Sequence, residues 1–168
     1  MLNGHEYVDL GLPSGTKWAT CNVEASAPEG YENRLWGETK PREERNDNYS
    51  YLEMNTLPSK DDAATVNWGI GWRMPTEYEI SELVNNCIYT WTNFNGVKGQ
   101  IFVGTNSNFI FLPFDYGYLF GEYWSSSICK TSKHRANAMW FHEGYSNESS
   151  DNREYPHLIR PVYDKSIK

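Results

Sequence analysis

The chain has 168 residues, which suits one domain, predicted over 1–168, because single domains commonly have about 100–200 residues. Its formal charge of −7, from 15 Lys and Arg against 22 Asp and Glu, argues against a nucleic-acid partner, since phosphate binding needs clustered basic side chains. A mean hydropathy of −0.71 argues against a membrane span, and the first ten residues do not have the pattern of a signal peptide.

The first elements that the sequence predicts are two short strands within 6–23. The cluster Pro13, Ser14 and Gly15 separates them, and such residues are typical of a tight turn. The following segment, 24–58, is polar and has no sustained period. We expect a long, loosely structured excursion there, held to the core by Leu35 and Trp36.

Two helices are predicted next. The first has Ser59 as its N-cap and ends before Gly69. The second begins at Thr76, whose side chain forms a capping box with Glu79, and its apolar stripe runs at helical spacing to Cys87.

The second half of the chain is rich in strand-forming residues. Runs of aromatic and β-branched residues at 88–94, 97–105 and 108–114 are separated by short turns, which is typical of an antiparallel meander. Two further strands are predicted at 137–142 and 157–163. In the first of these, alternation with Met139 and Phe141 facing inward turns Ala138, Trp140 and His142 outward.

Three cysteines, Cys21, Cys87 and Cys129, allow at most one disulfide within the chain. Cys21 and Cys87 lie in apolar patterns, which favours packed thiols over a bridge between them. The sequence has no C-x-x-C pair, so it gives no support for a zinc or redox pair of cysteines, and it leaves the redox state open.

Several stretches together carry a family resemblance: "EYVDLGLPSGTKWATCNV", "WGET", "DDAATVNWG", "GWRMPT", "WSSS" and "IRPV". In this order they resemble the Fibrobacter succinogenes major paralogous domain family, which is abundant in Bacteroidetes surface and secreted proteins. The resemblance implies an α+β, C-type-lectin-like fold with two helices, a small twisted antiparallel sheet and paired terminal strands. It also implies that Arg73 anchors loop carbonyls and that "WSSS" begins an irregular region.

Relatives with the C-type-lectin-like fold include variable proteins of diversity-generating retroelements, whose codons near the C-terminus are rewritten. Segment 128–158 departs from the family pattern at Cys129, where a tyrosine is common, and at Pro156, where a glycine is common. A rewritten, ligand-facing surface and ordinary drift in loops both explain such departures.

The candidate ligand-binding residues are aromatic, basic and amide side chains within this segment. Aromatic residues and arginine suit recognition surfaces, and asparagine adds adaptable hydrogen bonds. The alternative is a polar loop with a few packed aromatics, and Arg153 has a structural alternative of its own. The set is His134, Arg135, Trp140, His142, Tyr145, Asn147, Asn152, Arg153, Tyr155 and His157.

Neither a metal nor another cofactor is predicted. The calcium-binding triplets of lectins are missing, and the polar cluster Glu148, Asp151, Asn152 and Glu154 is interpreted as solvated. The histidines of segment 128–158 lack the spacing of a metal motif.

The sequence predicts no enzyme. A reactive cysteine pair like that of the formylglycine-generating enzymes is missing, and the serines at 125–127 lack a nucleophile elbow. We therefore expect a non-enzymatic module that recognises a protein or glycan on a cell surface. The alternative is an adhesin or carbohydrate-binding module of a larger exported bacterial protein. The resemblance implies a location on the cell surface, outside the cell or on a phage particle, and leaves an oligomer open.

Overall fold

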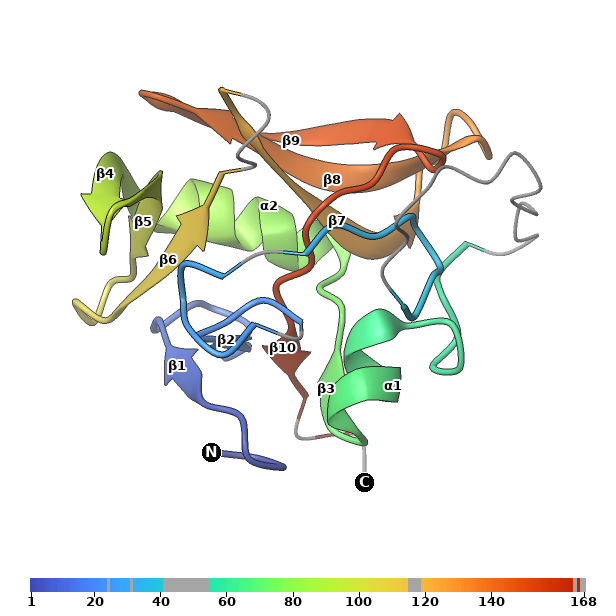
Figure 1. Cartoon of the computed structure of the whole chain (residues 1–168), viewed down its shortest axis with the longest axis horizontal. Helices are drawn as coiled ribbons and strands as arrows, with labels where there is room; N and C mark the ends of the chain where they lie inside the picture. Colours follow the sequence, from blue (N-terminus) through green and yellow to red (C-terminus); the bar gives the residue numbers. More distant parts are fainter. Residues whose placement is uncertain (24, 31, 41–54, 115–118, 165, 167–168) are drawn as a thin grey trace.

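A computed structural model describes residues 1–168 except 24, 31, 41–54, 115–118, 165 and 167–168 (Figure 1). Its described part contains three antiparallel sheets and two short helices. The first sheet has the order β1 (Tyr7–Asp9), β2 (Lys17–Ala19), β10 (Val162–Tyr163), β3 (Trp72–Arg73). The second contains β4 (Ile88–Phe94), β5 (Val97–Val103) and β6 (Phe109–Pro113), and the third β7 (Gly121–Ile128), β8 (Arg135–His142) and β9 (Tyr145–Asn152).

The expectation of an α+β, C-type-lectin-like fold built on two helices and one small sheet is wrong. Strands dominate the described residues, and they form three sheets with the third lying across the top of the view in Figure 1. The physical reason is that residues 121–128 and 145–152, where no strand was predicted and where the resemblance implied an irregular region from "WSSS" onward, form two full strands. The fold is therefore mainly β.

The two helices lie near their predicted places. Helix α2 (Glu77–Asn86) has the expected capping box, in which the Thr76 side chain and Glu79 satisfy each other's backbone N–H groups. Helix α1 (Ala63–Trp68) begins later than predicted, because Asp62 and not Ser59 is its N-cap. The Asp62 carboxylate accepts from the backbone N–H groups of Thr65, at 3.0 Å, and Met74, at 2.9 Å.

The predicted meander is confirmed. Strands β4 and β5 pair from Ile88 with Val103 to Phe94 with Val97, and Asn95 and Gly96 form the connecting turn with positive φ angles of 50° and 85°. Such a turn matches the twist of the strands that it joins. Segment 6–23 also contains the predicted pair of strands, β1 and β2.

The third sheet separates two apolar clusters. Met139 and Phe141 face the cluster that includes Ile80 and Leu83 of α2, so their inward orientation is confirmed. Ala138 is on the opposite face, as expected, but it is buried in a second cluster together with Trp36. One end of this opposite face is therefore covered, which the alternation alone could not show.

The predicted strand at 157–163 is shorter than expected. Only Val162 and Tyr163 form β10, while His157 and Leu158 each make an isolated bridge, to Arg34 and Tyr123 respectively. Leu35 and Trp36 are buried, as predicted for the anchors of segment 24–58, but residues 24, 31 and 41–54 of that segment lie outside the described part. Cys21, Cys87 and Cys129 are all free thiols. The described helices include none that is long and apolar enough to cross a bilayer.

Candidate binding surface

Strand register places several candidate side chains on one face of the third sheet. Trp140 pairs with Glu122 of β7 and with Asn147 of β9, and His142 pairs with Tyr145. Side chains of paired residues lie on the same face, and residues two apart along a strand share it. These five side chains therefore lie on the face opposite α2, which we call the outer face.

An aromatic cluster occupies the open end of the outer face. The ring centroids of Trp140 and His142 lie 4.9 Å apart, those of His142 and Tyr145 5.5 Å, and those of Trp140 and Phe120 6.1 Å. Tyr145 is 41% exposed, whereas the other three side chains are half-buried. The cluster therefore packs together and still presents ring surface to solvent.

A cavity of about 410 Å³ opens beside this cluster, and we call it the aromatic cavity. Strands of two sheets contribute to it, since Trp91 and Lys98 come from β4 and β5. Most of the side chains that line it are aromatic. The full lining is Trp91, Lys98, Phe114, Leu119, Phe120, Trp140, His142 and Glu143.

A second cavity, of about 520 Å³, adjoins the first, and we call it the acidic cavity. Phe120 lines both cavities, so an aromatic ring lies at their junction. The remaining lining combines carboxylates with exposed and buried rings: Asn33, Glu122, Asp151, Tyr155, Pro156 and His157.

Three ionisable side chains converge in the acidic cavity. His157 Nε2 donates to Asp151 Oδ2 at 3.0 Å and lies 3.4 Å from Glu122 Oε2. Burial and the negative charge of Asp151 raise the pKa of Glu122, although His157 opposes the shift. Burial also disfavours the charged form of Asp151, but hydrogen bonds from His157 and from the Asn152 backbone hold its pKa below the usual value.

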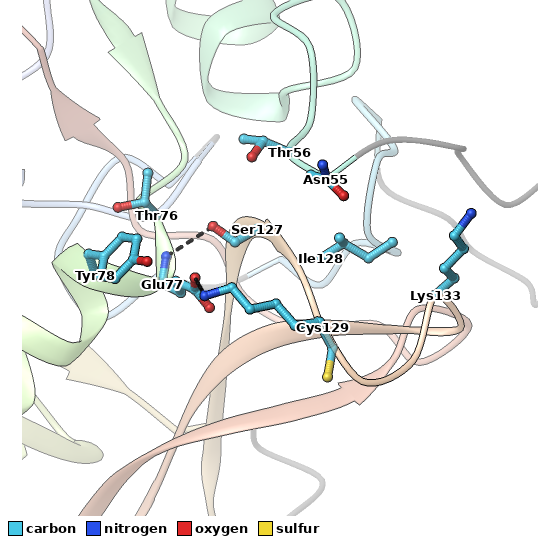
Figure 2. A pocket seen from close by; sticks show the side chains of 10 residues that line it. Asn55, Thr56, Thr76, Glu77, Tyr78, Ser127, Ile128, Cys129 and Lys133 are labelled. Atoms are coloured by element: carbon cyan, nitrogen blue, oxygen red, sulfur yellow. Dashed lines mark hydrogen bonds and ion pairs between the residues drawn. The ribbon is translucent and has the colours of Figure 1, made fainter.

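A third cavity, also of about 520 Å³, lies between the start of α2 and the end of β7 (Figure 2). The Glu77 N–H donates to Ser127 Oγ at 3.1 Å, and Lys130 Nζ lies 2.9 Å from Glu77 Oε1. The capping box uses further donors of this helix end. The Lys130 and Glu77 charges in this cavity are paired with each other, and these N–H groups of the helix end already have partners within the protein. None of the ten sequence-predicted residues lines this cavity.

The structure divides those ten residues into groups. Trp140, His142, Tyr145 and Asn147 gather at the open end of the outer face. Tyr155, which is exposed, and His157, which is buried, line the acidic cavity.

The other four of the ten belong to neither group. Arg153 is fully buried, with its guanidinium 4.9 Å from the Trp36 ring centroid, so its structural alternative is correct. Arg135 donates to the Ser150 side chain at 3.1 Å, while His134 is exposed. Asn152, at the end of β9, accepts from the Glu154 N–H at 3.1 Å.

Sequence reasoning missed several residues that line the two cavities. Phe120, Glu122 and Trp91 lie outside segment 128–158, and Glu122 would have been found had 121–128 been read as a strand, because it is two residues from Trp124 on the same face. The interpretation of Asp151 as a solvated carboxylate is also wrong, since it is half-buried against His157.

No protein-family model, curated protein or solved structure matches this chain. The family resemblance therefore stays a prediction, and the function has to be argued from the geometry described above.

Proposed function

We propose that the protein is a recognition module that binds a neutral oligosaccharide along the aromatic and acidic cavities. Aromatic side chains provide broad apolar contact for the faces of sugar rings, and carboxylates accept hydrogen bonds from hydroxyl groups. Binding sites for small ligands commonly combine a mostly apolar, concave lining with a few polar groups that fix orientation.

The observation that carries this proposal is the position of Phe120 in both cavities. It makes one recessed surface in which Trp140 lies on one side and Tyr155, Glu122 and Asp151 lie on the other. A recessed surface of this kind fits a chain of sugar rings better than a flat protein partner, whose interface would need a broad complementary patch.

Charge selects among glycans. Lys98 and Glu143 contribute opposite charges to the aromatic cavity, the chain carries a formal charge of −7, and Glu122 and Asp151 add two carboxylates to the acidic cavity. Sialylated or sulfated glycans would meet like charge there, which costs binding free energy and slows association. We therefore expect the ligand to be uncharged.

Substitution of the outer-face rings tests the proposal. Trp140→Ala should reduce glycan binding at least about tenfold, as for a central aromatic residue of an interface, because Trp140 lines the aromatic cavity. Tyr145→Ala should reduce it less, because the Tyr145 ring only packs beside those of Trp140 and His142. The unfolding temperature should change little for Tyr145→Ala, because its ring is 41% exposed. Neutral and acidic glycans on an array identify the ligand, and calorimetry of each variant gives the affinity.

Tyr78→Ala is the matched control, since Tyr78 is 71% exposed and lies at the third cavity. Loss of binding in this control, or binding of acidic glycans alone, would contradict the proposal. So would attachment to cells that survives periodate oxidation of their sugars and is lost after protease treatment, because the ligand would then be a protein.

The remaining functional expectations stay predictions. An adhesin or carbohydrate-binding module of a larger exported protein uses the same chemistry, and a location on a cell surface or phage particle suits both. Diversification by a retroelement predicts a reverse transcriptase gene nearby and a near-copy of the 3′ coding segment that differs at adenines. A gene neighbourhood with neither would discard that version.

A further inference from the structure

We propose that Glu122, Asp151 and His157 form a binding site for a divalent first-row transition-metal ion such as Zn²⁺. The ion shares Glu122 and Asp151 with the proposed oligosaccharide surface, but its binding does not require sugar, because it needs only these three side chains and the open volume beside them. Nothing in the spacing 122, 151 and 157 resembles a sequence motif, so the site exists only through the fold.

The donor atoms already lie at the separations that ligands of one ion require. One atom from each residue can be chosen so that all three lie within 4.8 Å of one another. The His157 Nε2 atom, 3.0 Å from Asp151 Oδ2 and 3.4 Å from Glu122 Oε2, is the common neighbour. Their side chains are only 8%, 22% and 15% exposed, so these are not freely solvated surface groups.

The framework holds each ligand from a different segment. Glu122 and Asp151 come from β7 and β9, whose positions the pairing with β8 fixes. His157 is bridged to Arg34 by two backbone hydrogen bonds of 2.9 and 3.0 Å, and its ring centroid lies 4.2 Å from that of Trp124. Such support keeps metal ligands oriented before the ion arrives.

The local charge favours a cation. Two carboxylates face one imidazole, so two like charges lie close together around a single nitrogen ligand. Arg135 forms an ion pair with Asp151 of this cluster. The pair is loose, because the Arg135 Nη2 atom lies 4.0 Å from Asp151 Oδ1 and the Arg135 side chain is 45% exposed. A divalent ion would compensate the charge of both carboxylates.

The donor set selects the kind of ion. One imidazole nitrogen and two carboxylate oxygens suit Zn²⁺ and its neighbours, while Ca²⁺ prefers about six to eight oxygen ligands. Three protein ligands leave coordination positions for water, and the acidic cavity of about 520 Å³ provides room for it.

Calorimetric titration of the whole chain with Zn²⁺, without sugar, tests the site. We expect one ion per chain, with binding weakened at least about tenfold in Glu122→Gln and in Asp151→Asn, which keep side-chain size. Glu148→Gln, a carboxylate variant on the α2 side of β9, should bind as the wild type does. Cys129→Ser should also bind normally, which excludes the half-exposed thiol as the ligand.

Nuclear magnetic resonance of the wild type gives a second, independent readout. Zn²⁺ should move the imidazole signals of His157 and leave those of His142 in place. If the Gln and Asn variants fail to fold, this readout alone decides, and unmoved His157 signals overturn the proposal. Loss of binding in Cys129→Ser, unchanged binding in both folded carboxylate variants, or absence of Zn²⁺ binding would also overturn it.

The metal and oligosaccharide proposals fail separately. Trp140→Ala should still bind Zn²⁺, because Trp140 lines the aromatic cavity and is not one of the three ligands. Binding of Zn²⁺ without binding of sugar would support the metal proposal alone. Binding of sugar without binding of Zn²⁺ would support the oligosaccharide proposal alone.

Discussion

Arg73 and Glu79 form a half-buried ion pair that connects two elements at the start of α2. The guanidinium donates to both carboxylate oxygens of Glu79, at 2.7 and 2.8 Å, and its Nε donates to Asp164 at 3.1 Å. The expectation that Arg73 anchors loop carbonyls is only partly correct, since one bond, of 3.1 Å, goes to the Met74 carbonyl. Its main partners are carboxylates, and Asp164 is too distant in sequence to be found from a local pattern.

The first prediction is that Glu79 makes the fold sensitive to acid. Burial disfavours its charged form, yet the hydrogen bonds and charge of Arg73 hold its pKa below the usual value. Its contribution is therefore complete above the pKa of the unfolded chain, about 4.3, and disappears as the pH falls through the lower pKa of the folded state. Glu79→Gln should lose about 2 kcal/mol of unfolding free energy at pH 7.

Urea unfolding at pH 7 and at acidic pH measures both quantities. Glutamine still supports a capping box, so the loss reports on the missing charge more than on helix initiation. Equal pH dependence in wild type and Glu79→Gln would show that this carboxylate is not the source of acid sensitivity.

At the scale of elements, strand β7 shows how polar residues form a buried strand. Ser125 and Ser126 are buried, and their hydroxyls donate to the backbone carbonyls of Asn137, at 2.8 Å, and Pro75, at 3.3 Å. Serine has no strong strand preference, so the sequence could not show that tertiary partners satisfy these groups. By contrast, α2 and the 88–113 meander were predictable because periodicity and turn residues are local signals.

Buried residues of β8 and β9 limit how freely segment 128–158 can vary. Ala136, Met139, Phe141 and Ser146 lie on β8 or β9 and are buried, so they belong to the core and not to a replaceable surface. The positions that can change at little cost are the exposed ones of the outer face, such as Tyr145 and Asn147. A diversified set of sequences would therefore vary in alternate positions along each strand.

A close approach between elements gives the next prediction. Gly104 follows β5, and a Cβ atom added there would lie 1.9 Å from the backbone oxygen of Leu10. Gly104→Ala should therefore cost about 3 kcal/mol, because backbone atoms must move to relieve the overlap. Urea unfolding measures the change.

Gly96→Ala is the matched control. Its Cβ would meet nothing within 4 Å, so only the positive φ of 85° opposes it, at a cost of about 1 kcal/mol. Equal losses in the two variants would mean that the approach of residue 104 to Leu10 does not limit packing.

At the scale of the whole molecule, the candidate site depends on contacts that no sequence pattern describes. Segment 128–158 was singled out for residues such as Trp140, Tyr145 and Tyr155, whose types alone suggest recognition, and of these Tyr145 and Tyr155 are exposed and Trp140 is half-buried. The cavities also need Trp91 from another sheet and Asn33 from the first quarter of the chain. Strand order and register decide which residues become such partners. The sequence does not show how strands of three separate sheets are ordered and aligned.

Arg160 joins distant parts of the chain into one core. Its fully buried guanidinium donates to Asn22 Oδ1 at 2.8 Å, to the Ala19 carbonyl at 3.1 Å and to the Phe111 carbonyl at 2.9 Å. Burial lowers the pKa of Arg160, so the hydrogen bonds offset the cost of an enclosed charge. The N-terminal segment, β6 and the chain before β10 are thus connected through one side chain.

The last prediction follows from this geometry. Arg160→Lys retains the charge but replaces a planar fork by a single ammonium group, which cannot reach Asn22, Ala19 and Phe111 together. At least two buried acceptors would lose their donor, so the unfolding free energy should fall by about 3 kcal/mol or more. Arg135→Lys, an exposed change of the same kind, should stay within about 0.5 kcal/mol of the wild type. Similar urea midpoints for both variants would show that the packing of the three segments, and not the guanidinium fork between them, holds this core together.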